Sequence, residues 1–328
     1  MKAVYIKQFG GPENLEVRDV PDPSNPSGTQ ILIRVRAAAL NRADLLQRRG
    51  LYPAPAGVGQ NIPGLEFAGE VVEIGENATQ WKVADRVFGI TAGEAQAEVF
   101  LTEESLLAKI PDNLSFTDAA AIPEAFITSH DGIFTQGNLL KGETILIHAV
   151  GSGVGLAALQ LANAKGAKTI GTSRTADKLE KCREFGLEEA ILTGENANFA
   201  DIIKDKTAGR GVDVVLDLVG AAYFQENLDS LALKGRLLLV GLTSGAHAEF
   251  NLATALSKRL KIIGTVLRGR SLDEKAEATR KFAEHVLPLI ESAKIRPNVD
   301  KVFRCEDVQN AHRYLESNES FGKVILEF

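Results

Sequence analysis

A glycine-rich segment is the most informative chemical feature of this sequence. Gly151, Gly153 and Gly155 lie in the segment Ala149–Gly155, directly after the apolar run Thr144–Ala149. The apolar residues that follow recur at the spacing of one helix face. Glycines let the backbone approach a pyrophosphate closely, and a helix N-terminus presents free N–H groups and a positive dipole end to it. A turn between a strand and a helix is therefore predicted to bind a dinucleotide.

The same turn has two other interpretations. The strict Gly-x-Gly-x-x-Gly spacing that ends at Gly155 falls on Val150 and Ser152, so a glycine-rich turn without a ligand is one alternative. Ser152 could also be a hydrolase nucleophile, but that motif needs glycine two residues to either side. Those positions hold Val150 and Val154, which excludes the hydrolase interpretation.

The end of the next predicted strand indicates which nucleotide binds. An NAD site has an Asp or Glu about 20 residues after the glycines, bound to the ribose 2′-hydroxyl. Here the strand end has no acid, whereas Ser173, Arg174 and Lys178 offer hydrogen-bond donors and positive charge. These groups suit a 2′-phosphate, so NADP(H) is the predicted cofactor. A basic, solvated helix start is the alternative, and the nearest acid, Asp177, would lie on that helix.

Two later strand ends complete the candidate cofactor site. The predicted strands Val212–Asp217 and Arg236–Gly241 end at the segments Asp217–Gly220 and Leu239–Leu242, each of which contains a glycine. In open α/β sheets ligands lie outside the carboxyl ends of the strands, at the switch in strand order. These segments are candidates to line the nicotinamide, with plain turn glycines as the alternative.

Cysteine and histidine usage gives no sign of a metal site. The two cysteines, Cys182 and Cys305, are far apart, which excludes a disulfide scaffold and a Cys-rich zinc lobe. No two of the five histidines stand four residues apart, and we expect no metal. His148 is predicted to satisfy a buried backbone group, and His312 to lie in the core.

The elements that must position these residues fall into three regions. Residues 1 to about 120 contain short apolar runs between Gly and Pro clusters, typical of a sandwich or barrel, with one polar helix near residues 41–49. Strands and helices then alternate, which indicates a parallel sheet with helices on both faces. The last ~60 residues contain two helices and the strand Lys323–Phe328, and we expect them to return to the first domain.

Composition narrows the class of protein further. The 328 residues are 45% apolar and 24% charged, as in soluble globular proteins, and the length suggests two domains. A net charge of −6 gives no electrostatic footprint for nucleic acid or an anionic membrane. No apolar run approaches the ~20 residues that span a bilayer, and the N-terminus resembles a strand rather than a signal peptide. We expect a cytoplasmic protein.

Taken together, the motifs of the whole chain resemble those of the zinc-independent quinone oxidoreductases in the medium-chain dehydrogenase/reductase superfamily. The motifs that carry this resemblance are Gly10–Leu15, Ala39–Leu45, Pro63–Glu66, Ala119–Ala125, Ile147–Ala149, Gly153–Gly155 and Gly322–Leu326. The resemblance implies an α/β protein with two domains and NADPH between them. Residues 1–123 and 268–328 would form a GroES-like β-rich domain, and residues 124–267 a Rossmann domain with a doubly wound parallel sheet. It also implies a homodimer.

The resemblance sharpens the expectation about metal. Zinc-dependent relatives have ligands at the places of Asn41, Leu65 and, approximately, Glu124, and all three are replaced here. An alcohol dehydrogenase polarises its substrate oxygen with Zn²⁺. Without that Lewis acid, the expected substrates are quinones or activated enones, in which delocalisation stabilises the oxyanion that develops.

The resemblance also implies roles for single residues. Asn41 and Tyr52 would lie at the nicotinamide end as the catalytic candidates, although Asn41 also fits a helix N-cap. Thr193 stands where relatives often have a tyrosine near the adenosine. Asp44 and Glu66 are expected to be structural. The further cofactor contacts implied are Thr128, Ser152, Gly153, Val154, Thr175, Lys178, Val219, Gly220, Gly241, Leu242, Leu267 and Lys323.

The predicted function is hydride transfer from NADPH to a quinone. Reduction of α,β-unsaturated carbonyls uses the same motifs and is the first alternative. A non-catalytic NADPH-binding protein is the second. No residue stands out as a dedicated general acid, so hydride transfer is mainly a matter of positioning, with water able to protonate the product.

Overall fold

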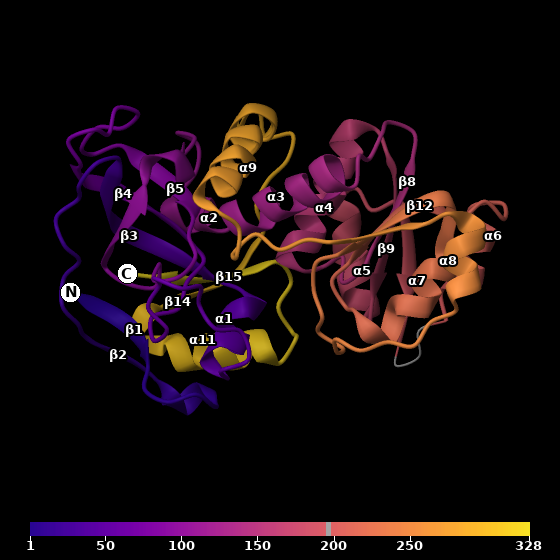
Figure 1. The fold of residues 1–328 in the computed structure, drawn as a ribbon, viewed down its shortest axis with the longest axis horizontal. Helices are drawn as coiled ribbons and strands as arrows, with labels where there is room; N and C mark the ends of the chain where they lie inside the picture. The colour runs from indigo at the N-terminus through magenta and orange to yellow at the C-terminus, as the bar shows by residue number, and fades with distance from the viewer. Residues whose placement is uncertain (195–197) are drawn as a thin grey trace. The chain divides into compact units, whose positions relative to one another are not determined.

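The chain folds into two compact units, which Figure 1 shows as ribbons. The structure is a computed structural model that describes residues 1–194 and 198–328. Met1–Ile127 and Leu267–Phe328 form the first unit, and Thr128–Val266 form the second. The sequence placed the divisions after residues 123 and 267. A β-rich unit together with a parallel-sheet unit confirms the predicted fold class.

The first unit is built on a seven-stranded sheet with strand order β14-β15-β3-β4-β5-β7, and β6 pairs with β3. Strands β1 and β2 form a separate antiparallel pair. The strands of this unit are β1 (Lys2–Ile6), β2 (Leu15–Asp19), β3 (Gln30–Leu40), β4 (Glu66–Ile74), β5 (Arg86–Ile90), β6 (Val99–Glu103), β7 (Leu107–Lys109), β14 (Val299–Arg304) and β15 (Lys323–Glu327).

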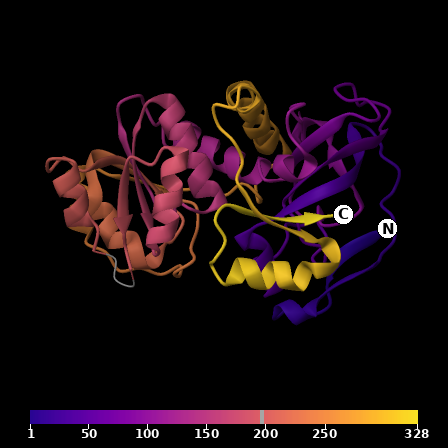
Figure 2. The same cartoon turned by 180° about the vertical axis from the view of Figure 1, so that it is seen from behind.

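The C-terminal strand returns to the N-terminal region, as the sequence predicted. β15 pairs antiparallel with β3, with Val324 opposite Leu40. Figure 2 shows this return as the yellow segment beside the indigo strands. The pairing brings Lys323, at the start of β15, next to the residues that follow the end of β3.

The helices of the first unit cover its sheets. They are α1 (Arg42–Arg48), α2 (Phe116–Ala120), α9 (Leu272–His285), α10 (Leu287–Glu291) and α11 (Val308–Glu316), and α3 (Pro123–His130) begins in this unit. The inner face of α11 is formed by Val308, Ala311, His312 and Leu315, all buried. Three of these residues share a core with β1 and β15, and His312 is fully buried, as predicted.

In the described part of the second unit, six parallel strands form the sheet, in the order β10-β9-β8-β11-β12-β13. They are β8 (Thr144–Ile147), β9 (Lys168–Ser173), β10 (Glu189–Leu192), β11 (Val212–Asp217), β12 (Leu231–Leu239) and β13 (Lys261–Gly264). Because β8 to β10 run outward and β11 returns beside β8, the strand order reverses between β8 and β11. A ligand of an open α/β sheet binds at this switch point.

Helices connect these strands, as the predicted alternation requires. They are α4 (Gly153–Lys165), α5 (Ala176–Cys182), α6 (Ala200–Lys206), α7 (Phe224–Ser230) and α8 (Leu252–Lys258). A π-helix spans Asp131–Gln136, and short 3-10 turns occur at Pro12–Asn14, Glu104–Leu106, Arg183–Phe185, Ala221–Tyr223 and Cys305–Asp307. No helix in the described part of the chain is long and apolar enough to cross a membrane.

Two predicted strand limits were wrong. The run Thr144–Ala149 leaves the sheet after Ile147, because Ala149 adopts a left-handed conformation with φ of 47°. The strand predicted at Arg236–Gly241 runs instead from Leu231 to Leu239. It ends early because the N–H group of Gly241 turns to donate to the carbonyl of Asp217.

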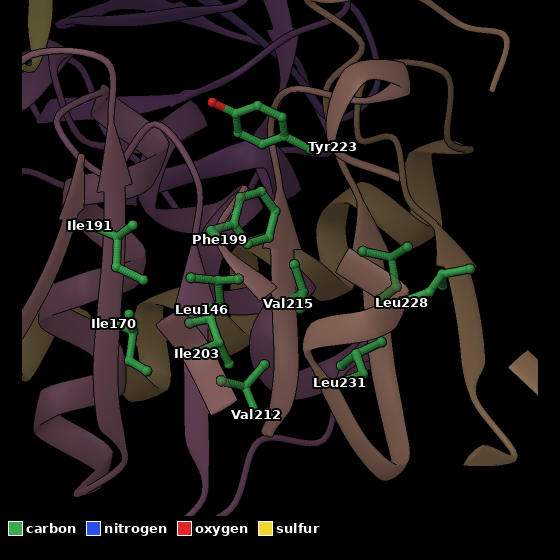
Figure 3. Packing of buried hydrophobic residues seen from close by; sticks show 11 residues of the cluster. Leu146, Ile170, Ile191, Phe199, Ile203, Val212, Val215, Tyr223, Leu228 and Leu231 are labelled. Atoms are coloured by element: carbon green, nitrogen blue, oxygen red, sulfur yellow. The ribbon is translucent and has the colours of Figure 1, made fainter. Parts of the chain in front are cut away.

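The core of the second unit lies between the sheet and the helices on one face (Figure 3). It contains Leu146, Ile170, Ile191, Phe199, Ile203, Val212, Val215, Tyr223, Leu228, Leu231 and Leu237. Phe199 and Tyr223 pack edge to face, with ring centroids 5.2 Å apart. The ring of His148 lies 4.9 Å from both. This aromatic cluster fixes His148 next to the start of the glycine turn.

Candidate functional site

The glycine turn forms the N-terminus of α4 at the switch point. Ser152 is the N-cap of this helix, and its hydroxyl accepts a hydrogen bond from the N–H of Gly155 at 3.1 Å. Within the described chain the N–H groups of Gly153 and Val154 have no acceptor, as expected for the first residues of a helix. These two N–H groups can receive an anion, which is the chemistry the sequence predicted for the turn.

Gly155 has a different task from its neighbours. A Cβ at this position would lie 2.5 Å from the carbonyl oxygen of Ala149 and 2.7 Å from that of Val150. Only glycine therefore lets α4 pack this closely against the end of β8. Close packing of helix on strand is the role of the last glycine in a dinucleotide-binding turn.

The end of β9 presents positive charge without a competing acid. Arg174 and Thr175 are exposed and Lys178 is half-buried, where α5 begins. Asp177, the nearest acid, forms an ion pair with Lys181 at 2.7 Å on the same helix. The Asp177 carboxylate is thus paired along α5, and the positive charge of Arg174 and Lys178 lies at the strand end.

Ser173 and Thr193 face each other across the neighbouring strand ends. The carbonyl of Ser173 accepts hydrogen bonds from the N–H and hydroxyl of Thr193, at 3.0 and 3.2 Å. Thr193 in turn accepts a hydrogen bond from the hydroxyl of Tyr223 at 2.9 Å. Sequence reasoning missed Tyr223, because it comes from the 3-10 turn after β11, the next strand along the chain from Thr193.

A buried polar chain shapes the turn after β11. Asp217 accepts hydrogen bonds from the N–H groups of Val219 at 2.7 Å and Gly220 at 3.0 Å, and its other oxygen accepts from the amide of Asn227 at 3.1 Å. Asn227 contacts Nε2 of His148 at 2.6 Å. The chain thus links the start of the glycine turn to the turn after β11, the two segments at the switch point.

The partners of His148 correct one prediction. We expected this side chain to satisfy a backbone group, but it bonds the side chains of Asn227 and Thr172, at 2.6 and 2.8 Å. Since the Asn227 amide donates to Asp217, its oxygen accepts, which places the proton of His148 on Nε2. Burial lowers the pKa of His148 to about 4, so the ring is neutral and is not a proton donor near neutral pH.

The turns after β11 and β12 are held together. Ser244 donates to the carbonyl of Val219 from both its N–H and its hydroxyl, at 2.8 Å each. Gly220 has a φ of 90°, and a Cβ at Gly241 would lie 2.8 Å from the carbonyl of Leu218. Both glycines are thus required by the turns themselves. The structure brings Val219–Gly220 and Gly241–Leu242 side by side, as a shared cofactor wall requires.

In the first unit, Asn41 and Lys323 are joined through Glu66. The ammonium of Lys323 donates to the carbonyl of Leu40, to Oδ1 of Asn41 and to Oε1 of Glu66, at 3.1, 2.7 and 2.6 Å. The Asn41 amide also donates to Oε1 of Glu66 at 2.9 Å. The three protons of Lys323 are therefore used inside this cluster, although the resemblance implied a place for this residue at the cofactor.

Asn41 also begins α1, as its N-cap interpretation predicted. Its N–H donates to the carboxylate of Asp44 at 2.7 Å, and the other oxygen of Asp44 accepts from the N–H of Gly64 at 3.0 Å. The side chain of Asn41 is occupied by Glu66 and Lys323, so this amide is held by an ion pair rather than by the helix.

Glu124 is the residue that sequence reasoning underused. Its N–H donates to Oε2 of Glu66 at 2.8 Å, so the Glu66 carboxylate lies at the start of α3, where its charge acts on the Glu124 carboxyl. Burial, reinforced by the negative charge of Glu66, raises the pKa of Glu124 to about 8. The sequence did contain a sign of this role, because Glu124 is the one acid in the apolar segment Ala119–Ile127. Burying an isolated carboxylate is unfavourable, and such a group tends to keep its proton.

Tyr52 is packed against an arginine that the sequence analysis did not select. Arg268 is 4% exposed and donates to the carbonyls of Ala92 and Tyr52 and to the side chain of Gln47, at 2.7, 3.2 and 2.6 Å. The guanidinium lies 5.1 Å from the centre of the Tyr52 ring. Burial raises the pKa of Tyr52, so the phenol stays neutral and can donate a hydrogen bond.

Thr128 and Leu267 stand at the two unit boundaries. Thr128 opens the second unit and Leu267 resumes the first. The hydroxyl oxygen of Thr128 is buried and has no hydrogen-bond partner among the described residues. A buried polar group without a partner is rare in folded proteins, and a ligand is one means of satisfying it.

The residues at the places of the relatives' zinc ligands do not form a donor set that fits zinc. Asn41 is engaged with an ammonium group, Leu65 has no ligating atom and is 3% exposed, and Glu124 is the only carboxyl of the three. Over residues 1–194 and 198–328, no group of three or more His, Cys, Asp or Glu side chains is arranged to hold a metal ion.

Comparisons with known proteins place the chain among oxidoreductases. Residues 27–128 match the alcohol dehydrogenase GroES-like domain, and residues 153–286 match the zinc-binding dehydrogenase family. The quinone oxidoreductase of Pseudomonas aeruginosa is 34% identical, over 99% of this chain and 99% of that protein. The crystal structure of Escherichia coli quinone oxidoreductase complexed with NADPH has a TM-score of 0.90 and 30% identity, covering 100% of both chains. The JamJ enoyl reductase has a TM-score of 0.89 and 26% identity, covering 99% of this chain and 98% of that one.

Proposed function

Because the chain belongs to the quinone oxidoreductase family of the medium-chain dehydrogenase/reductase superfamily, we propose that it is an NADPH-dependent, zinc-independent quinone reductase. The single observation that carries this proposal is the β9 end, where Arg174 and Lys178 follow the strand and Asp177 is held by Lys181. That arrangement favours a 2′-phosphate over a ribose hydroxyl.

The chain's own residues fit this cofactor in three places. The N–H groups of Gly153 and Val154 would bind the pyrophosphate at the start of α4. Arg174 and Lys178 would bind the 2′-phosphate, and the unpaired hydroxyl of Thr128 would gain a polar partner. When bound, NADPH supplies a hydride from its nicotinamide ring. The protein's contribution is to hold the acceptor against that ring.

The proposed acceptor follows from what this unit lacks. Reduction of an aldehyde builds an alkoxide whose charge is localised on one oxygen and needs a cation beside it, whereas the oxygen of a reduced quinone is stabilised by its own ring. Lys323, the cation bonded to Asn41, is paired with Glu66. The hydroxyl of Tyr52 has no protein partner among the described residues and can orient the acceptor oxygen.

Reduction of an enone is the second candidate, and the likeness to an enoyl reductase favours it. A quinone and an enone share a conjugated, electron-poor carbonyl, so the same residues serve both. The two differ in the atom that receives hydride, which acceptor kinetics can distinguish.

A panel of acceptors tests the proposal. We expect NADPH to be oxidised by simple quinones, by enones more slowly, and by aldehydes at rates near background, with no effect of chelators. Aldehyde turnover equal to quinone turnover would contradict the proposed acceptor class. NADPH binding without turnover of any acceptor would instead support a non-catalytic binding protein.

Tyr52→Phe tests the role of the phenol within the same assay. Removing one hydrogen bond that orients the acceptor should lower kcat about tenfold or less, because such a bond contributes roughly 0.5–1.5 kcal/mol. Loss of all activity would show that Tyr52 is an obligatory proton donor. Tyr5→Phe, in β1, is the matched control.

We also propose that the chain forms a homodimer through the free edge of the second unit's sheet. Among the described residues β13 pairs only with β12, and Ile262 on it is 41% exposed. On the neighbouring α8, Leu252 and Leu256 are 72% and 81% exposed. An unpaired edge beside apolar side chains favours pairing with a second copy. Analytical ultracentrifugation should show a dimer, and Leu256→Glu should shift it to a monomer.

A further inference from the structure

Three acidic side chains of the first unit lie around one ammonium group, and they differ in their hydrogen bonds. Glu66 accepts from Lys323 and Asn41 on Oε1 and from the N–H of Glu124 on Oε2. Asp44 accepts from the N–H groups of Asn41 and Gly64. Glu124 accepts no hydrogen bond from any described residue. Donors stabilise the ionised form of the first two carboxyl groups and leave the third without such support.

The charges around Glu124 also favour its protonated form. Lys323 is one of the cations that act on Glu124, but its three protons are bound to Leu40, Asn41 and Glu66. Arg268 is bound to two carbonyls and Gln47, and Lys275, on α9, is buried at 8% exposure. Glu66 and Asp44 add negative charge. When two neighbouring carboxyl groups compete, the one with fewer donors keeps the proton.

One local feature acts against this assignment. Glu124 lies in the first turn of α3, where a helix dipole favours the anion. Burial and the adjacent Glu66 outweigh it, and together they raise the pKa of Glu124 to about 8. Of the three carboxyl residues, Asp44 and Glu66 are fully buried, and only Glu124 has intermediate exposure.

We propose that Glu124 is the proton donor of the reaction, a role that rests on the proposed function. When the acceptor takes up a hydride with its electron pair, negative charge is left on its oxygen. The O–H bond of the Glu124 carboxyl breaks, and the proton forms a new O–H bond on that oxygen. The resulting Glu124 carboxylate lies beside Glu66 and regains a proton from water, which restores the acid. No further oxidant or reductant is needed.

The cluster also explains how a proton donor persists at neutral pH. The Glu66–Lys323 pair is internally balanced, so it supplies Glu124 with a negative neighbour but no free cation. The different surroundings of Glu66 and Glu124 separate the pKa values of the two carboxyl groups. One site can therefore hold an ionised and a protonated carboxyl together. In this arrangement Glu66 and Lys323 are positioning residues, and Glu124 is the catalytic one.

The first test needs no cofactor. Difference infrared spectroscopy of the wild-type protein and of Glu124→Gln, titrated across neutral and alkaline pH, reports protonated carboxyl groups directly. We expect a protonated carboxyl band at neutral pH that disappears around pH 8 and is absent from Glu124→Gln. A wild-type spectrum without such a band, or a band that survives in Glu124→Gln, would overturn the proposal.

The second test is kinetic. With a simple quinone, kcat of Glu124→Gln should fall by roughly 10²-fold, at the lower end of what general acid catalysis contributes. The KM for NADPH should stay within about twofold, since Glu124 is not assigned to cofactor binding. Wild-type kcat should fall as pH rises past about 8, and this fall should vanish in Glu124→Gln. Glu124→Asp should restore part of the rate and the pH dependence.

Controls separate this proposal from a loss of fold and from failure of the proposed function. Glu291→Gln, at an exposed site at the end of α10, is the matched control and should behave as wild type. If Glu124→Gln does not fold, the wild-type titration and Glu124→Asp still decide. If wild-type turnover is normal and Glu124→Gln equals it, only the proton-donor role fails. If no acceptor is reduced by wild type, the proposed function fails, and this role with it.

Discussion

At the scale of single residues, the unusual feature is the buried ion pair of Lys323 and Glu66, in which all three N–H groups of the ammonium are hydrogen-bonded within the cluster. Lys323 is 6% exposed and Glu66 is fully buried, and Asn41 bridges them. Taking two charges out of water is costly, and their attraction offsets this only when the remaining hydrogen bonds are satisfied. Here each oxygen of Glu66 has a donor, which explains how the pair is tolerated in the core.

Replacing one partner of this pair should be much worse than replacing both. Lys323→Met leaves the Glu66 carboxylate buried without its cation, and we expect a loss of roughly 3–5 kcal/mol in the free energy of unfolding. The double variant Glu66→Gln with Lys323→Met should recover a large part of that loss. Urea denaturation of the two variants and of wild type measures both. Equal destabilisation in single and double variants would contradict the account.

At the scale of elements, the cofactor site is made by strand ends and one helix start. β8 and β11 lie side by side because the strand order reverses between them, and both end in turns held by the His148–Asn227–Asp217 chain. β9 ends beside them with Arg174 at its limit. No single motif fixes the site, but the order of the strands places the ends together.

The end of β9 predicts a strong preference between nucleotides. NADPH should bind at least about tenfold more tightly than NADH, because a charge-assisted hydrogen bond contributes roughly 1.5–3 kcal/mol and 1.4 kcal/mol is about tenfold. Fluorescence titration measures both dissociation constants. Arg174→Ala combined with Lys178→Ala should weaken NADPH binding and leave NADH binding nearly unchanged.

Arg183→Ala is the matched control for that experiment. Arg183 is 52% exposed and pairs with Glu180 at the far end of α5, so the variant removes a surface cation of the same segment without touching the β9 end. Equal affinities of the wild-type protein for the two nucleotides would refute the assignment of Arg174 and Lys178.

At the scale of the whole molecule, buried titratable groups of both units act on stability in opposite directions. Burial lowers the pKa of His148 to about 4 and of His312 to about 3, below the value of an unfolded histidine. These neutral rings make their whole contribution to the free energy of unfolding above pH ~6.5, and this contribution is lost as pH falls. Burial raises the pKa of Asp44 and Asp217 to about 6, which adds stability as pH falls.

His312→Gln isolates one side of this balance. The variant cannot take up the proton that the unfolded wild-type chain binds, so wild type should lose about 1.4 kcal/mol per pH unit relative to it between pH ~6.5 and ~4. The free energy of unfolding, measured by urea titration at several pH values, gives the slope. Exposed His247→Gln is the control and should follow the wild-type slope. Parallel curves for wild type and His312→Gln would contradict the prediction.

The sequence by itself determined the class of fold and the turn that begins α4. Alternating apolar runs, glycine positions and the basic strand end are local patterns, and local patterns are set by backbone sterics and burial of one face. The core position of His312 followed from helical spacing in the same way. The glycines of the turn were found because close backbone approach leaves no room for a Cβ.

Tertiary structure alone decided how the charged residues are partnered. Lys323 and Asn41 are far apart in sequence, and only the pairing of β15 with β3 brings them together. The protonation of Glu124 depends on Glu66, which reaches it from another element. Such partnerships arise from long-range packing, and a pKa depends on burial and neighbouring charge that no local pattern contains. For that reason the sequence offered no general acid, while the folded chain presents one.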